Sequence, residues 1–252
     1  MSSMSFLLVA LFLPLFPFSI LFNRLFARTG NTGLRIALLI GWPATGIALL
    51  SILGDTPPEW IVYWSVATAL MYGFRALALR DLVLWLGHLA TSTWALMWLP
   101  AAYGGVTTSL VTTLAVFGLP LALLLWLTGH LEQRFGAAYA GSLDGLASSL
   151  PRLSGALVLL VLAAIGTPFF PGFFALLGIV SDLLPKLPLA ALGVLVLWML
   201  WAWAGMRILQ GLIVGRPGNA THSDIGLAHT SILGVTVVVF ASCGIWLSGN
   251  LI

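Results

Sequence analysis

The sequence predicts an all-α, polytopic membrane protein of about eight transmembrane helices, one of which is broken or kinked. Composition is the first reason: 60% of the 252 residues are hydrophobic and only 7% are charged, and a soluble domain of that composition would expose large apolar patches. Length is the second, because the apolar stretches run to about the 20 residues that a helix needs to cross a hydrocarbon core of roughly 30 Å. The third is the alternation of charge between successive connections.

The apolar stretches can be placed in order along the chain. We expect helices over residues 5–22, 34–54, 60–79, 82–101, 106–128, 153–180, 187–214 and 230–248. The first stretch has no basic residue before its apolar run, so we interpret it as a retained helix and not as a signal peptide. The connections are short, and none resembles a domain linker. We therefore expect one transmembrane domain over residues 1–252, composed of a helix pair (1–54) and a six-helix region (60–252).

The basic residues fall almost entirely on one side of the expected bundle. Nine of the ten lie in or beside alternate connections: Arg24, Arg28, Arg35, Arg75, Arg80, Arg134, Arg152, Arg207 and Arg216. The opposite connections hold Asp55, Glu59, Asp182 and Lys186. Because Lys and Arg of short loops stay on the cytoplasmic side, we expect a bacterial inner-membrane protein with both termini on the periplasmic or exterior side. The connection 137–149 is then cytoplasmic.

The tryptophans fall into two groups. Four lie near expected helix ends, where an indole prefers the membrane interface: Trp60, Trp98, Trp126 and Trp246. Three fall inside the stretch 187–214, where we expect packing or lipid contact in preference to a binding role: Trp198, Trp201 and Trp203.

The stretch 153–180 is unusual because its middle carries helix-breaking residues. Pro168 and Pro171 remove backbone donors, and Gly166 and Gly172 weaken the helix around them. We expect a break between Gly166 and Gly172, with the freed carbonyls facing protein, and such breaks often mark translocation sites. A simple packing kink is the alternative. Milder interruptions of the same kind are Gly118-Leu119-Pro120 and the pair Pro14 and Pro17.

Three motifs resemble the antiporter-like subunits of respiratory complex I, which are related to subunits of multi-subunit cation/proton antiporters and membrane-bound hydrogenases. The segment 76–82, Ala-Leu-Ala-Leu-Arg-Asp-Leu, is similar to the family's alanine-rich helix that ends in Gln-x-Asp-Ile/Leu-Lys-Arg. Gly118-Leu119 resembles the family's His-Gly-Leu helix, and Gly129 with Arg134 resembles the Gly-x-x-x-x-Arg end of that helix. The loop that follows in the family is similar to Asp144-Gly145-Leu146 and Pro151-Arg152-Leu153. The most specific match is Gly166-x-Pro168-x-x-x-Gly172-Phe173, which resembles the family's broken-helix motif Gly-Leu-Pro-Gly-Thr-x-Gly-Phe.

The resemblance covers the six later helices, and we expect the first two to match the family's first two. Full family members have more helices, so the middle segment, which carries a glutamate–lysine pair, is expected to be missing here. The resemblance implies a subunit of a larger energy-converting membrane complex. Its partners would be other membrane subunits of a hetero-oligomer, together with lipid.

The departures from the family concern its titratable residues. Val83 and Leu84 stand where the family has lysine and arginine, Phe117 replaces its histidine, and Leu176 replaces an acidic or basic residue. A proton path through lipid needs a chain of titratable groups, because an isolated charge at the bilayer centre costs several kcal/mol. We therefore expect an accessory, non-pumping subunit. The alternative is a subunit of an ion-coupled transporter, such as a cation/proton antiporter or an inorganic-carbon uptake complex.

Four polar residues remain as candidates for an ion path or for structural roles. His88 is the histidine expected inside a helix, as a packing residue or a proton relay. Arg75 lies near a helix end, where it would snorkel or pair with Asp81. Arg207 lies about two turns inside its helix and is expected to need a partner, either Asp81 or a carboxylate of another subunit.

Other classes of function find no support in the sequence. The basic residues form neither cluster nor stripe, so no nucleic-acid partner is expected, and no cofactor, metal site or catalytic constellation is recognised. Five polar residues are expected on the cytoplasmic side, where they fit no metal pattern and are expected to lie in a solvated loop: His130, Glu132, His222, Asp224 and His229.

Overall fold

The computed structural model describes residues 3–104, 109–143, 145–215 and 224–248, and the regular elements of that part are α-helices. Asp144 of the second family motif, and the residues Arg216 and His222, lie outside the described residues. The helices are α1 (Ser3–Phe12), α2 (Ser19–Arg28), α3 (Thr32–Leu53), α4 (Glu59–Ala76), α5 (Leu82–Leu96), α6 (Trp98–Tyr103), α7 (Leu110–Phe135), α8 (Leu146–Ser149), α9 (Pro151–Ala164), α10 (Pro171–Leu183), α11 (Pro188–Ile213) and α12 (Leu227–Ser248).

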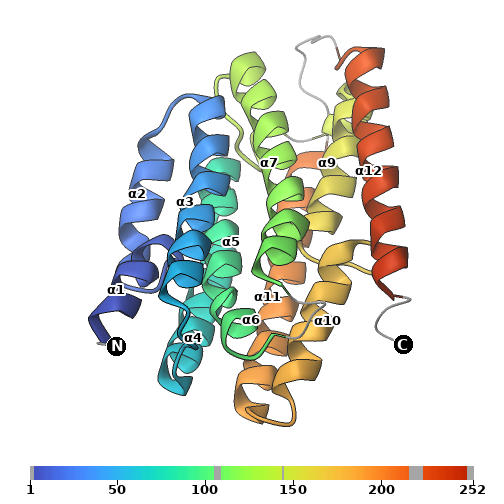
Figure 1. The fold of residues 1–252 in the computed structure, drawn as a ribbon. Helices are drawn as coiled ribbons and strands as arrows, with labels where there is room; N and C mark the ends of the chain where they lie inside the picture. Colours follow the sequence, from blue (N-terminus) through green and yellow to red (C-terminus); the bar gives the residue numbers. More distant parts are fainter. Residues whose placement is uncertain (1–2, 105–108, 144, 216–223, 249–252) are drawn as a thin grey trace.

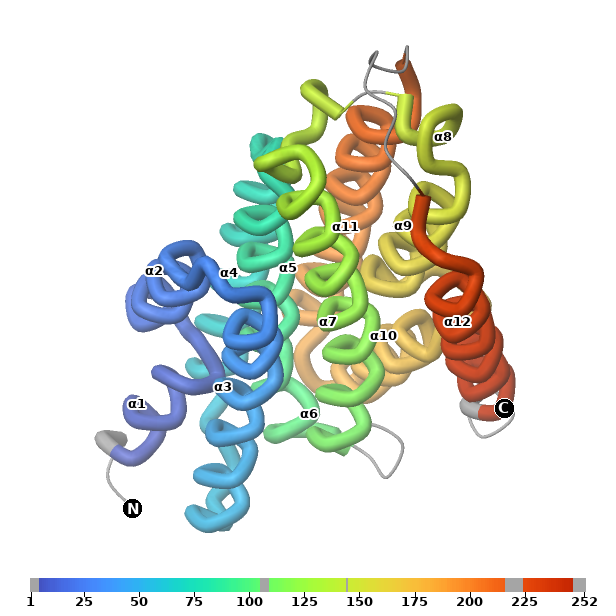
Figure 2. Tube along the Cα trace, turned by 90° about the horizontal axis from the view of Figure 1, so that it is seen from above, coloured from blue at the N-terminus to red at the C-terminus, as the bar shows by residue number. Residues whose placement is uncertain are grey.

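The long helices form one bundle with roughly parallel axes, seen from two directions in Figures 1 and 2. Five segments of the described part are long and apolar enough to cross a membrane: α3, α5 together with α6, α7, α11 and α12. Adding α4 and the two interrupted pairs α1–α2 and α9–α10 gives the eight crossings that the sequence predicts. The chain is thus a multi-pass membrane protein.

The helices lie where the sequence predicts them, but several differ from the prediction in where they begin or end. The stretch 5–22 is not one helix, because α1 ends at Phe12 and α2 begins at Ser19. The fold therefore has two interrupted crossings instead of one. The helix expected over 106–128 continues to Phe135 in α7, which ends at Gly136 with φ +79°, a left-handed conformation that glycine adopts without strain. The division into a helix pair and a six-helix region stays a prediction.

Burial divides the helices into a centre and a rim. The span of α5 and α6 is 89% buried, and α5 packs against α2, α3, α4, α6 and α7. The span of α12 is only 11% buried, and α12 lies at the edge of the bundle against α9 and α10 (Figure 2). Polar groups that could carry chemistry inside the protein must therefore be sought around α5.

The two faces at which the helices begin and end carry different charged residues. In Figure 1 the starts of α3, α9 and α12 lie at the same face as the end of α7, and α1 begins and α12 ends at the opposite face. The first face carries the described arginines, and the second carries the connections with Asp55 and Lys186. We call the first face the basic face.

Candidate functional site

The crossing made of α9 and α10 is broken where the sequence predicts it. Helix α9 ends at Ala164, and α10 starts at Pro171, whose missing N–H is harmless in the first turn of a helix. Between them Gly166 and Phe169 both adopt positive φ, +68° and +80°. Positive φ is ordinary for glycine and strained for phenylalanine. The predicted interruption between Gly166 and Gly172 is confirmed.

The carbonyls freed by this break find partners within the protein. The indole N–H of Trp198 in α11 donates to Gly166 O at 3.0 Å. The hydroxyl and the backbone N–H of Thr167 both donate to Leu162 O, at 2.9 and 3.1 Å. Lipid offers no such donors, so these contacts make the irregular backbone tolerable at this depth. Trp198, expected only to pack, has a hydrogen-bonding role.

The interruption between α1 and α2 uses the same device. Three indoles from three other helices donate to its freed carbonyls: Trp42 to Leu11 O (2.8 Å), Trp64 to Phe16 O (2.8 Å) and Trp98 to Leu13 O (3.0 Å). Trp98 is fully buried, so its expected place at the interface is wrong. Sequence reasoning rated Pro14 and Pro17 as a mild perturbation, although two prolines three residues apart remove two helical donors within one turn.

His88 lies two turns into α5 and is partly buried. Its Nδ1 lies 2.8 Å from Leu84 O and must carry the proton, because a carbonyl only accepts. Its ring and the ring of Tyr72 in α4 pack edge to face, with ring centroids 5.3 Å apart. The Tyr72 hydroxyl lies 2.9 Å from the hydroxyl of Ser19 in α2. His88 is thus part of a polar contact between three helices close to the basic face.

The next three residues along α5 after Ala90 commit their hydroxyl protons to backbone carbonyls. Thr91, Ser92 and Thr93 each donate at 2.8 Å, to Gly87 O, Ala69 O and Leu89 O respectively. Buried apolar side chains follow from Trp94 to Leu99. The polar stretch that starts at His88 therefore continues along α5 as hydroxyl groups and contains no further ionisable group there before Tyr103.

The three charged candidates lie apart from one another in the structure. Asp81 caps α5 by accepting from Leu84 N at 3.0 Å. Arg75 is exposed in the last turn of α4, and Arg207 is exposed on α11. Neither guanidinium forms an ion pair within the described part, where the one salt bridge is between Arg35 and Glu132. Asp81 is therefore not the partner of Arg75 or Arg207 in the described part, because its carboxylate caps its own helix, and the alternatives of snorkelling for Arg75 and of a carboxylate of another subunit for Arg207 stay predictions.

Three of the four positions where the family resemblance implies titratable groups hold buried apolar side chains, Val83, Phe117 and Leu176, and the fourth, Leu84, is exposed. Phe117 of α7 and Trp201 of α11 meet edge to face with ring centroids 6.0 Å apart. The Trp201 indole donates to Ser92 Oγ at 3.0 Å, so its polar atom is satisfied inside the core. Leu176 is fully buried. A Cβ at Gly172 would lie 3.2 Å from the Phe117 ring, so the break and this aromatic pair pack directly together.

Sequence reasoning missed one partly buried ion pair. Arg35 of α3 and Glu132 of α7 meet at 2.7 Å, with their side chains 9% and 29% exposed. Arg35 also donates through Nε to Thr29 O. The two residues are 97 positions apart, so no local pattern could have paired them, and Glu132 does not belong to a solvated loop as expected. Asp224, assigned to the same loop, caps the start of α9.

Comparison with known proteins gives the fold a context. No protein-family model and no curated protein matches the sequence. Solved structures do match. A chain of respiratory complex I from Thermus thermophilus matches with TM-score 0.81 at 20% identity, over 94% of this chain and 53% of that chain. A chain of the Mrp complex from Dietzia sp. matches with TM-score 0.81 at 20% identity, over 96% of this chain and 55% of that chain. A chain of the membrane-bound sulfane sulfur reductase, an archaeal respiratory membrane complex, matches with TM-score 0.80 at 15% identity, over 96% of this chain and 52% of that one.

This chain spans about half the length of each of these chains. At identities of 15–20% the match establishes architecture and not activity. The broken crossing α9–α10 and the surrounding long helices agree with the resemblance drawn from the motifs. The chain shares its fold with about half of a chain from each of these three membrane complexes.

Proposed function

We propose that the chain is an accessory, non-pumping membrane subunit of a multi-subunit energy-converting complex related to complex I. It lies in a bacterial inner membrane, with the basic face cytoplasmic and both termini on the exterior side. Its role is to pack against other membrane subunits and to complete their membrane assembly.

The observation that carries this proposal is the apolar filling around the broken crossing. Phe117, Trp201 and Leu176 are each buried near the break, and the Trp201 indole N–H donates to Ser92 Oγ inside the core. Proton transfer needs groups that change protonation state within relay distance of one another. A core of phenylalanine, tryptophan and leucine supplies none.

The second candidate function is a subunit of an ion-coupled transporter. Two observations favour it. The crossing α9–α10 is interrupted at the broken-helix motif. The ring of His88, whose Nε2 is an acceptor when Nδ1 carries the proton, packs edge-on against Tyr72, and the Tyr72 hydroxyl lies 2.9 Å from that of Ser19. This cluster lies near the basic face only. It favours a local structural role for His88 over a path across the bilayer.

Gentle extraction from native membranes tests the accessory role. A tagged full chain is solubilised in mild detergent, and mass spectrometry identifies what co-purifies, with an unrelated tagged multi-pass protein as the control. We expect a stoichiometric set of membrane subunits together with peripheral redox subunits. Recovery of the chain alone, or with a solute-binding partner only, contradicts the proposal.

A further inference from the structure

A cleft of about 220 Å³ lies between α9 and α12 and is open on one side. Its walls include Pro151, Gly155 and Leu159 of α9 and Leu233 and Gly234 of α12. It exceeds the roughly 150 Å³ of an apolar protein cavity that takes up benzene. A hydrocarbon chain therefore has room here without displacing protein.

Glycines keep the cleft open. A Cβ added at Gly155 or at Gly234 would meet no atom within 4 Å, because both glycines face the gap between the two helices. Elsewhere α12 does approach the bundle closely: a Cβ at Gly244 would lie 2.5 Å from Phe169 O. The helix thus approaches the bundle backbone closely at Gly244 and leaves a gap over α9 at Gly234.

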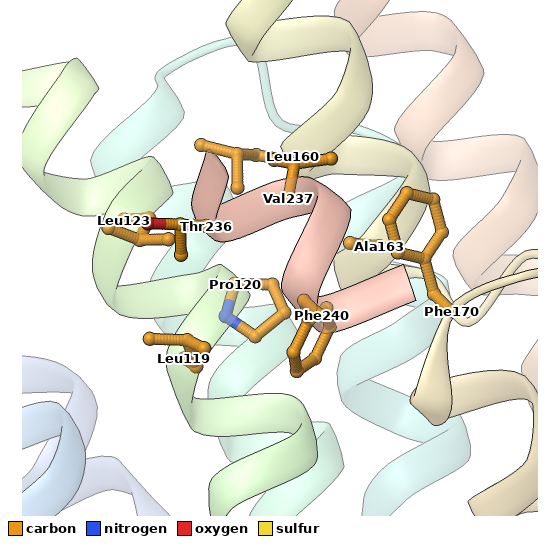
Figure 3. A pocket seen from close by; sticks show the side chains of 9 residues that line it. All are labelled: Leu119, Pro120, Leu123, Leu160, Ala163, Phe170, Thr236, Val237 and Phe240. Carbon is orange, nitrogen blue, oxygen red and sulfur yellow. The ribbon is translucent and has the colours of Figure 1, made fainter. Parts of the chain in front are cut away.

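The two ends of the cleft differ in size and polarity. Toward the helix break the gap narrows to a space of about 10 Å³, which shares the walls Leu160 and Val237 and continues to Pro120 and Phe240 (Figure 3). The hydroxyl of Thr236 in that narrow part donates to Ile232 O at 2.9 Å. The wide end lies at the basic face, where α9 and α12 both begin (Figure 1).

Arg152 lines the wide end and offers an exposed guanidinium. Asp224 forms no ion pair with this guanidinium: its carboxylate accepts the backbone N–H groups of Arg152 (2.8 Å) and Leu153 (3.2 Å) at the start of α9. The one hydrogen bond of the guanidinium within the described part is a long one, from Nη1 to Ile225 O at 3.4 Å. Most of its five N–H donors therefore remain for an anion.

We propose that the cleft holds an acyl chain of an anionic phospholipid whose phosphate binds Arg152. An apolar groove that begins at a cationic side chain at the membrane surface complements the two parts of such a lipid. The lipid then fills the space that α12 leaves over α9. This site is independent of whether the chain pumps protons and of its partner subunits.

Photo-crosslinking of the purified full chain in liposomes tests the site. The probes are phosphatidylglycerol and phosphatidylcholine that carry the same diazirine in the acyl chain, and mass spectrometry locates the adducts. We expect adducts on α9 and α12 peptides with phosphatidylglycerol, about fivefold above phosphatidylcholine, as one basic side chain at the surface gives. Excess inorganic phosphate leaves the labelling unchanged, because the acyl chain provides most of the binding.

Matched variants separate the cleft from its charge. Gly155→Leu with Gly234→Leu fills the cleft and removes the adducts, whereas Gly41→Leu, at an exposed α3 glycine where a Cβ also meets nothing within 4 Å, leaves them unchanged. Arg152→Gln keeps the backbone cap and lowers phosphatidylglycerol labelling to the phosphatidylcholine level, and Arg28→Gln does not. Equal labelling by both lipids, or adducts that survive the filled cleft, overturns the proposal. If the double variant does not fold, Gly234→Leu alone gives the same two outcomes.

Discussion

The indole N–H of Trp198 donates a 3.0 Å hydrogen bond to the carbonyl oxygen of Gly166, and this bond fixes α11 to the point where α9 ends. At the α1–α2 interruption the indole N–H of Trp98 likewise donates a hydrogen bond to the carbonyl oxygen of Leu13, at 3.0 Å. An unpaired carbonyl in hydrocarbon costs several kcal/mol, so the two breaks depend on donors delivered by neighbouring helices. Tryptophan suits this task because its large ring packs in the core while its one polar atom donates.

Replacing Trp198 by Phe removes the donor and keeps most of the packing. We expect the free energy of unfolding to fall by about 1–3 kcal/mol, the range for leaving one buried acceptor unsatisfied. Thermal unfolding in detergent measures the loss. The control is Trp203→Phe on the same helix, because Trp203 is 61% exposed. Equal stability of the two variants contradicts a role for the Trp198 bond.

How much the sequence could predict differs between these two breaks. Pro168 and Pro171 stand between two glycines in the middle of a long apolar run, so local chemistry alone locates the second break. At Pro14 and Pro17 the apolar run is of ordinary length for one crossing, and the composition hides the interruption. The indole donors to both breaks come from residues tens of positions away, and only the packing of the bundle reveals them.

The charged residues show the same limit. The side of the bundle on which the arginines gather follows from their spacing along the chain, because connections alternate between the two faces. Whether a given arginine is buried and paired, as Arg35 is, or exposed, as Arg207 is, depends on which helix lies opposite. Which helix lies opposite is decided by tertiary packing, and no local sequence pattern predicts it.

Breaking the Arg35–Glu132 pair should destabilise the α3–α7 contact. Glu132→Gln leaves a nearly buried guanidinium without its counter-charge, and we expect a loss of about 2–3 kcal/mol, less than for a fully buried pair because Glu132 is 29% exposed. Arg35→Met combined with Glu132→Leu should recover most of the loss, since it removes both charges. Chemical unfolding of the wild type, Arg35→Met, Glu132→Leu and the double variant closes a cycle and gives the coupling energy. Additive losses count against the pair.

Adding one methyl group at Gly244 should loosen α12 from the break. A Cβ there would lie 2.5 Å from Phe169 O and 3.0 Å from Pro171 N, both backbone atoms that cannot rotate away. We expect Gly244→Ala to lower the free energy of unfolding by about 1–3 kcal/mol. Gly234→Ala on the same helix adds its methyl group to open space and should be neutral. Thermal unfolding of both in detergent decides, and an unaffected Gly244→Ala refutes the close approach.

The orientation of the bundle can be tested at the end of α7. Gly136 closes α7 at the basic face, so the following connection should be cytoplasmic. A phosphatase that is active only outside the cytoplasm should be inactive when fused after Gly136, and a cytoplasmic reporter should be active there. The same pair of reporters fused after Gly54, which ends α3 at the other face, should give the reverse result. Phosphatase activity at Gly136 inverts the proposed topology.

The last prediction is that the purified chain does not carry protons across a membrane. His88 and Tyr103 are 15 residues apart on the α5–α6 segment, about 22 Å at 1.5 Å per residue. The three hydroxyls just beyond His88 donate to backbone carbonyls, and Trp94, Met97 and Trp98 fill the next turns.

One histidine cannot bridge that length, since a proton relay needs titratable groups close enough to exchange protons. In liposomes with an imposed pH gradient and an internal pH-sensitive dye, the wild-type chain and His88→Ala should both relax at the rate of empty liposomes. A protonophore added at the end verifies that the gradient was intact. Fast dye response in the wild type that His88→Ala abolishes would instead assign the chain to the ion-coupled transporters, with His88 as its proton-carrying group.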